Sequence, residues 1–457
     1  MRQDKTQLWL SVLEAELIPA LGCTEPIAIA YAAALASELL GEKPEHLELQ
    51  ASNNIIKNVK SVIVPNSGGR RGLAVATCLG ALAGNAAGKL EVLKELSEED
   101  LPEVEAFIAA GKITVSQLQS PYPLHLIVIA SAKGKQLKVE IRDQHTKVIK
   151  IERNGVALKA EDLPEHLSFV LKAEQEAGNS EACRAESCAA GKLETKLSND
   201  ELFAESNFFE LLDFCENCEI ELFRPLLERQ YECNVAIAKQ GLEAEWGQQL
   251  GRHRMPESKE MPRRLYLQRL AQGFTAAASD ARMGGCTLPV VINSGSGNHG
   301  LTVSLPVWVY AKEEGIEEER FLRALLLSNL LTLYQKAFIG RLSAFCGITS
   351  AAASAVASIA WMLGAEEREI AEIVSNSLGG VSGMVCDGAK DSCAFKIVNA
   401  LNCAFAAWDL AQDGFRFHSG DGLIKSDIDS TIRAIGEMAK EGMHETDEKI
   451  VEIMIRD

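Results

Sequence analysis

The stretch AFCGITSAAASAVASIAW at residues 344–361 decides how the C-terminal half of the chain folds. It carries no charge and consists mainly of small residues, which predicts a helix packed closely inside a protein core. The run is too rich in Ala and Ser for a membrane span, and it is shorter than the roughly 20 apolar residues that such a span needs. Cys346 stands just ahead of the helix, where the positive helix end lowers the pKa of a thiol.

A second stretch, VCDGAKDSCAF at residues 385–395, places Cys386 and Cys393 on either side of a loop rich in Gly, Asp and Lys. Thiolates are the ligands that iron-sulfur clusters require, and three cysteines can hold three irons of a 4Fe-4S cluster while the fourth iron stays open. On spacing alone, a purely structural role for these cysteines is a strong alternative to a metal site, because a buried cysteine also behaves as a small hydrophobe.

Working outward, residues 263–457 predict an all-α domain that contains these three cysteines. A helix is expected from Pro262 to about Met283, and a Gly-rich run follows between Gly284 and Gly300. Four or five Ala-rich helices are expected after it. Their Ala, Ser and Gly content predicts close helix packing.

The N-terminal residues 1–162 predict an α+β part, so the fold class of the whole chain is α+β. Its first helix is expected at residues 6–18. In GCTEP, Thr24 can cap a second helix, Glu25 suits the positive helix end and Pro26 suits the first turn. Apolar residues alternate at 46–52 and 57–65, and a β-meander is expected at 125–153. Residues 163–262 are more charged and predict a variable helical segment.

Charge and composition narrow the function classes. With 64 acidic against 46 basic side chains, the formal net charge is -18, which repels nucleic acid and anionic lipid. The N-terminal residues alternate charged and apolar side chains, unlike a signal peptide. We therefore expect a cytoplasmic protein that acts on a small molecule and binds neither nucleic acid nor membrane. A homodimer is compatible with the sequence.

Two segments resemble loops that bind anions. One is NSGSGNHG at residues 293–300 and the other is SNNIIKN at residues 52–58, where Gly permits close approach and Ser, Asn and Lys donate hydrogen bonds. Neither matches a nucleotide-binding pattern. His299 is a candidate general base near neutral pH, and the alternative is a loop histidine that hydrogen-bonds the backbone.

The segment Cys215 to Cys218 is a CxxC motif, and further cysteines lie near it in the sequence, namely Cys183, Cys188 and Cys233. A zinc site has to be considered, but a zinc ribbon requires two CxxC pairs at suitable spacing. Solvent-accessible or lightly packed thiols are the favoured interpretation.

Taken together, GCTEP, SNNIIKNVKSVIVPNSGG, the SGSGNHG loop and the three cysteine segments resemble the L-cysteine desulfidase family, which is similar to the α-chain of iron-sulfur L-serine dehydratases. The resemblance covers residues 17–422 and is weakest at 163–260. It implies a helical domain of the serine dehydratase α-chain type. By its pattern of ligands, Cys346, Cys386 and Cys393 hold a 4Fe-4S cluster with one open iron.

The implied reaction is β-elimination of L-cysteine to pyruvate, ammonia and sulfide, without pyridoxal phosphate. For the base we favour Cys23 at its helix start, with Glu25 and His299 as alternatives. The groups expected to hold the substrate are Asn53, Asn54, Lys57, Asn58, Ser294, Ser296 and Asn298.

Two other functions stay open. The first is L-serine dehydratase activity on the same fold and cluster, which differs only in the leaving group. The second is a non-enzymatic sensor, in which the cluster reports oxygen or iron and the amino acid is bound without turnover.

Overall fold

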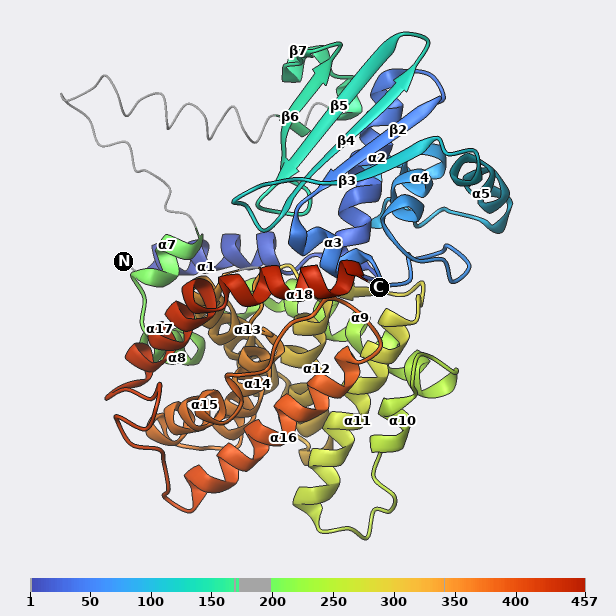
Figure 1. Cartoon of the computed structure of the whole chain (residues 1–457). Helices are drawn as coiled ribbons and strands as arrows, with labels where there is room; N and C mark the ends of the chain where they lie inside the picture. Colours follow the sequence, from blue (N-terminus) through green and yellow to red (C-terminus); the bar gives the residue numbers. More distant parts are fainter. Residues whose placement is uncertain (1, 168–169, 172–198, 341, 457) are drawn as a thin grey trace, which may run out of the picture. The chain divides into compact units, whose positions relative to one another are not determined.

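A computed structural model describes residues 2–167, 170–171, 199–340 and 342–456 (Figure 1). The chain forms two compact units, one of Met1–Cys23 with Asn199–Asp457, called here the helical unit, and one of Thr24–Ser198, called the sheet unit. Cys183 and Cys188 lie outside the described residues. Within the described ranges, no helix is long and apolar enough to cross a bilayer.

The sheet unit contains a six-stranded mixed sheet in the order β3-β2-β4-β5-β6-β7. Its strands are β2 (His46–Ala51), β3 (Ile113–Gln117), β4 (His125–Ala132), β5 (Lys135–Arg142), β6 (Val148–Arg153) and β7 (Val156–Ala157). β2 is parallel to β3 and antiparallel to β4. β4, β5 and β6 form the predicted meander, which is confirmed. Alternate residues of β5 are buried, as expected for a strand with one face on the core.

Helices cover this sheet on its buried face. They are α2 (Thr24–Leu40), α3 (Asn53–Val59), α4 (Leu73–Ala83) and α5 (Leu101–Ala109), with short turns η1 (Ala86–Glu91), η2 (Glu98–Asp100), η3 (Ala160–Asp162) and η4 (Glu165–Leu167). α2 packs against β4, β5 and α4 (Figure 1). The packing of α2 on α4 is backbone to backbone, because a β-carbon on Gly80 would lie 2.1 Å from the carbonyl oxygen of Ala30.

One predicted strand is wrong. Residues 57–65 alternate as a strand would, yet residues 53–59 form α3 and the next residues form a turn with a single bridge between Ile63 and Arg71. The alternation is too short to outweigh the burial of Ile55 and Val59 on one helical face. Strand β3 was not predicted, and four of its five residues are exposed. An exposed edge strand carries little hydrophobic pattern for sequence analysis to detect.

The helical unit confirms the all-α prediction for the C-terminal part. Its long helices in the second half are α11 (Arg263–Met283), α12 (Gly297–Glu314), α13 (Glu318–Ile339), α14 (Ile348–Met362), α15 (Glu367–Val381), α16 (Cys393–Gln412), α17 (Ile428–Glu437) and α18 (His444–Arg456), with a π-helical turn η6 (Met438–Gly442). Every residue of α14 is buried, and α12, α13, α15 and α16 pack around it. Small side chains allow this close approach from all sides.

The helical unit also contains segments from outside residues 263–457. This division differs from the three segments expected from the sequence, which were 1–162, 163–262 and 263–457. The added elements are α1 (Arg2–Glu16), β1 (Pro19–Leu21), α7 (Asn199–Ala204), α8 (Phe208–Asn217), η5 (Ile220–Leu222), α9 (Arg224–Glu243) and α10 (Leu250–Arg254). β1 pairs with β8 (Pro289–Val291) in a small antiparallel sheet. This pairing, and the packing of α9 on α11, join the N-terminus to the helices.

Candidate active site

Two of the predicted cluster ligands, Cys346 and Cys386, lie on paired segments of backbone. The Cys346 N–H donates to the Met384 carbonyl at 3.0 Å, and the Cys386 N–H donates to the Ala344 carbonyl at 2.6 Å. These bonds flank an antiparallel bridge between Phe345 and Val385. The segment before α14 therefore runs alongside the segment after α15, which brings together two cysteines that are far apart in the sequence.

The third predicted ligand, Cys393, is the first residue of α16. Its N–H donates to the Lys390 carbonyl at 2.9 Å, and its thiol contacts the Gly388 carbonyl at 3.6 Å. Burial raises the pKa of the Cys346 thiol to about 12, and the nearby Cys386 and Cys393 thiols raise it further. Burial also raises the pKa of Cys393, with Cys386 contributing. Cys346 and Cys393 thus both lie close enough to Cys386 for its charge to affect their ionisation.

Two lysines and an aspartate complete this loop. Lys396 donates to the Val385 carbonyl at 2.8 Å and pairs with the Asp387 carboxylate. Lys390 pairs with the same carboxylate at 2.7 Å. Burial alone would raise the pKa of Asp387, but hydrogen bonds from both lysines outweigh it and hold that pKa below its ordinary value. Two ammonium groups therefore lie near the thiols, and Asp391 adds a second carboxylate to the same loop.

The donor set fits an iron-sulfur cluster in its chemistry. Cys346, Cys386 and Cys393 are free thiols of the type such clusters require, and the charges of Lys390 and Lys396 favour the thiolate form of Cys393. Across the described residues, no group of three or more His, Cys, Asp or Glu side chains already has the spacing of a metal site.

His299 lies beside this cysteine group. It is buried in the first turn of α12, and its ring packs against Gly347, the residue that follows Cys346. A β-carbon on Gly347 would lie 2.5 Å from His299 Cε1 and Nε2, and 3.2 Å from Lys336 Cδ. Lys336 is a buried lysine near the end of α13 that sequence analysis missed. A single lysine in the segment LLTLYQKAFIG has no sequence signal that marks it as buried.

The Gly-rich loop before α12 is tightly built. Ser294 adopts a left-handed φ of 49°, and Gly295 follows with 74°. Asn293 and Ser296 exchange backbone hydrogen bonds at 3.2 and 3.0 Å, which closes the turn. The Asn298 side chain accepts from Ser279 Oγ at 3.2 Å. The loop residues expected to bind substrate thus lie next to His299 in the chain, with their own side chains partly committed to the fold.

Cys23, the predicted base, is buried at the end of the segment that follows β1. The carbonyl of the preceding Gly22 accepts a hydrogen bond from Arg282 Nε at 2.8 Å. The same guanidinium packs on Gly297, since a β-carbon there would lie 2.3 Å from Arg282 Nε. One arginine therefore holds both the GCTEP segment and the start of α12.

The remaining predicted residues form a buried polar group in the sheet unit. Glu25 accepts from Asn58 Nδ2 at 3.3 Å and from Thr24 Oγ1 at 3.1 Å. Lys57 and Asn54 are buried on the same short helix α3. By contrast, Asn53 accepts from Gln117 Nε2 at 2.6 Å near the surface.

Sequence analysis missed His145 in this group. It is 7% exposed, and its Nε2 lies 3.8 Å from Glu25 Oε1. Considering the part of the chain that is described, this nitrogen has no hydrogen-bond partner. The segment RDQHT predicts a turn between two strands of the meander, and nothing in it distinguishes a buried histidine from an exposed one.

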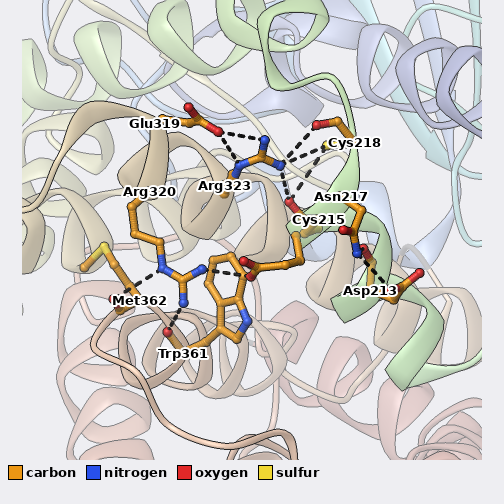
Figure 2. A network of polar contacts seen from close by, with 10 residues as sticks. Asp213, Cys215, Asn217, Cys218, Glu319, Arg320, Arg323, Trp361 and Met362 are labelled. Carbon is orange, nitrogen blue, oxygen red and sulfur yellow. Dashed lines mark hydrogen bonds and ion pairs between the residues drawn. The ribbon is translucent and has the colours of Figure 1, made fainter.

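The CxxC motif has a structural role that sequence analysis did not predict. Figure 2 shows Arg323 of α13 donating through Nη1 to the carbonyls of Cys215 and Cys218, at 2.8 and 3.1 Å. These carbonyls belong to the last turn of α8, which has no intrahelical donors for them. The arginine therefore caps the C-terminal end of α8 and interacts favourably with its dipole.

The expectation of solvent-accessible thiols is wrong for this pair. Cys215 and Cys218 are buried, and burial raises the pKa of both thiols. A guanidinium beside them disfavours a zinc ion, because the two cations repel each other. Arg320, one turn earlier on α13, stacks on Trp361 and donates to the Trp361 carbonyl, so α13 also secures the end of α14 (Figure 2).

Comparison with known proteins decides the family. The sequence profile of the serine dehydratase alpha chain matches residues 89–452. The chain belongs to the serine dehydratase alpha-chain family. The three predicted cluster ligands, Cys346, Cys386 and Cys393, and His299 lie inside the matched range.

Full-length relatives of this serine dehydratase alpha-chain protein carry the name UPF0597 protein. One from Lachnoclostridium phytofermentans is 43% identical over 98% of this chain and 99% of its own length. One from Treponema denticola is 38% identical over 100% of this chain and 99% of its own length. UPF0597 protein YhaM from Shigella sonnei is 36% identical over 98% of this chain and 97% of its own length. The predicted relationship to the α-chain of serine dehydratases is therefore confirmed.

Proposed function

We propose that the protein is an iron-sulfur lyase that eliminates sulfide from L-cysteine in the cytoplasm. The observation that carries the proposal is the backbone pairing of Cys346 with Cys386, with Cys393 close enough to affect the ionisation of Cys346. Buried thiols with raised pKa values, such as those of Cys346 and Cys393, are poor nucleophiles, and their grouping with Cys386 is better explained by a shared metal cluster. The family of the chain supports lyase chemistry.

In this proposal Cys346, Cys386 and Cys393 hold the 4Fe-4S cluster, with no pyridoxal phosphate. When bound, the cluster supplies a Lewis acid at the iron that has no cysteine ligand. The chain's own groups position the substrate, hold its charges and move its proton. Lys390 and Lys396 offset the negative charge of the ligands, and the burial of Cys346 and Cys393 excludes water from one side of the site.

The chain also has to remove the α-proton of the substrate. We propose His299 for this step, because its ring lies against the residue that follows Cys346 and a neutral imidazole nitrogen accepts a proton near neutral pH. Cys23 stays the prediction from sequence, and Glu25 with its neighbour His145 is the further alternative. Ser294, Ser296 and Asn298 adjoin His299 and are proposed to orient the amino acid.

The products follow from the balance of the elimination. The α-proton moves to the base, the Cβ–S bond breaks, and sulfide leaves with the electron pair of that bond. The remaining aminoacrylate tautomerises to an imine, which water hydrolyses to pyruvate and ammonia. No oxidant or reductant is consumed.

L-Serine dehydratase activity is the second candidate function, because the matched family carries that name. Cysteine and serine share every group except the β-substituent, so the same residues would serve both. Thiolate is a softer and better leaving group than hydroxide, which favours cysteine at an iron site. The sensor alternative predicts binding of the amino acid without turnover.

Anaerobic assays of the reconstituted protein with both substrates test the proposal. We expect pyruvate, ammonia and sulfide from L-cysteine at least about tenfold more efficiently than pyruvate from L-serine, a gap of about 1.4 kcal/mol. Equal or better turnover of serine would assign the dehydratase function. Binding of cysteine with no sulfide released from fully loaded protein would favour the sensor.

A further inference from the structure

A polar seam runs along the contact between α13 and α14, and it begins next to Cys346. Gly347, Ser350 and Ser354 follow one another at spacings of three and four residues, so they lie on one face of α14. The facing residues of α13 are Gln335 and Lys336. Gln335 Nε2 donates to Ser354 Oγ at 2.8 Å, and Lys336 Cδ approaches Gly347.

The polar atoms at the start of this seam are incompletely satisfied. Ser350 is fully buried in the first turn of α14, and its Oγ has no hydrogen-bond partner among the residues that the structure describes. The same holds, within those described ranges, for Oε1 of the buried Gln335. A buried polar group without a partner destabilises the fold. A ligand that supplies the missing hydrogen bond to Ser350 would recover this cost.

The charges around Ser350 select an anion. Lys336 is 4% exposed, and its Cδ approaches Gly347 at the start of α14. The N-terminal end of this 15-residue helix carries the positive end of its dipole. An ammonium, a hydroxyl and a helix N-terminus together match the oxygens of a carboxylate. Because Gly347 has no side chain, the Lys336 side chain and the His299 ring can both approach this helix end.

We infer that Lys336 and Ser350 bind the α-carboxylate of the amino-acid substrate at the start of α14. The inference rests on the proposed function for the identity of the ligand and extends it by assigning the carboxylate subsite. The cysteine that precedes Gly347 is a cluster ligand in the proposal, so a carboxylate held here would place the β-carbon of the substrate close to the cluster. Neither residue was singled out by sequence analysis, because an isolated Ser or Lys within an apolar helix carries no motif.

Binding of two inert ligands tests this subsite. L-Alanine has the carboxylate and amino group of cysteine but no leaving group, and L-alaninamide replaces the carboxylate with a neutral amide. Dissociation constants are measured by calorimetry on the reconstituted full-length protein under anaerobic conditions. We expect the wild type to prefer L-alanine by about tenfold or more, as a charge-assisted pair would give.

Two variants and a matched control locate the effect. Lys336→Met should abolish the preference for L-alanine over L-alaninamide while amide binding persists, and Ser350→Ala should weaken L-alanine binding about three- to tenfold. Ser358→Ala is the control, because Ser358 Oγ is likewise buried without a partner among the described residues, but lies two turns further along α14. It should leave both constants unchanged.

The inference is overturned if the wild type binds both ligands equally or neither, or if Lys336→Met keeps the full preference. If Lys336→Met loses the binding of both ligands, the Ser350→Ala variant decides the outcome. Unchanged L-alanine binding in Ser350→Ala overturns the assignment. Sulfide release from L-cysteine is assayed separately on the same samples. Wild type that discriminates the two ligands yet releases no sulfide would retain the carboxylate subsite and refute the proposed elimination.

Discussion

The imidazole of His299 packs directly on the backbone of Gly347, where a β-carbon would lie 2.5 Å from His299 Cε1 and Nε2. This contact joins the Gly-rich loop to the segment that carries Cys346. It leaves no room for any side chain at position 347. A substitution at position 347 should therefore disturb His299, the proposed base, without changing a proposed cluster ligand.

Gly347→Ala should lower kcat for sulfide release at least about tenfold, because His299 or the start of α14 has to shift to avoid the new methyl group. Iron content should stay near that of wild type, since the cysteines are unchanged. Anaerobic kinetics with parallel iron analysis make the measurement. Wild-type kcat in a fully loaded Gly347→Ala variant would show that the His299 contact is irrelevant to catalysis.

The base itself is tested by two substitutions. His299→Gln removes the titrating group while keeping a similar polar side chain, and we expect about a hundredfold loss of kcat or more with the cluster retained. Cys23→Ala should cause a much smaller loss. A solvent deuterium exchange assay at the α-carbon of L-alanine provides a readout independent of turnover. If exchange is lost in Cys23→Ala and kept in His299→Gln, the base is Cys23, as predicted from sequence.

Arg323 offers a stability prediction away from the active site. Arg323→Leu removes the donors to the Cys215 and Cys218 carbonyls, and we expect the free energy of unfolding to fall by about 1–3 kcal/mol. The control is Arg368→Leu, which breaks an exposed pair with Glu372 and should change stability by less than about 1 kcal/mol. Denaturant unfolding of the cluster-free protein measures both. Equal effects of the two substitutions would contradict the capping role.

Much of the fold could be predicted from hydrophobic periodicity. The limits of α11 and the meander strands follow from local pattern, because a helix stripe and strand alternation are properties of neighbouring residues. The cysteines required the family resemblance, since their spacing alone also fits buried hydrophobes. Lys336, His145 and Arg323 could not be predicted, because each acts through a partner that only the tertiary fold brings near. Strand prediction failed at α3 because its seven residues are too few to distinguish the helical period of 3.6 residues from the strand period of two.

Asp280 provides a pH-dependent prediction. Burial raises the pKa of its carboxyl to about 6 from the ordinary 3.8; hydrogen bonds from the Gly251 and Leu250 backbone oppose the shift, and the charge of Asp391 adds to it. The folded state therefore binds this proton more tightly than the unfolded state. Stability should fall as the pH rises from about 4 to about 6, and the cost of ionised Asp280 is fully present above that range.

Asp280→Asn removes this cost. At pH 7.5 the variant should be more stable than wild type by about 1–3 kcal/mol, and the gap should shrink as the pH is lowered to 5. Asp413→Asn changes an exposed carboxylate and serves as the control, with no pH-dependent difference expected. Thermal unfolding across this pH range makes the comparison. A gap that does not vary with pH would contradict the assignment.

The central claim is that Cys346, Cys386 and Cys393 together hold one 4Fe-4S cluster, and the most direct test is the iron and acid-labile sulfide content of anaerobically reconstituted protein. We expect about four irons and four sulfides per chain in wild type and in Cys218→Ala. Cys386→Ser should lose most of both. A wild type without bound iron, or a Cys386→Ser variant with the full complement, would contradict the account.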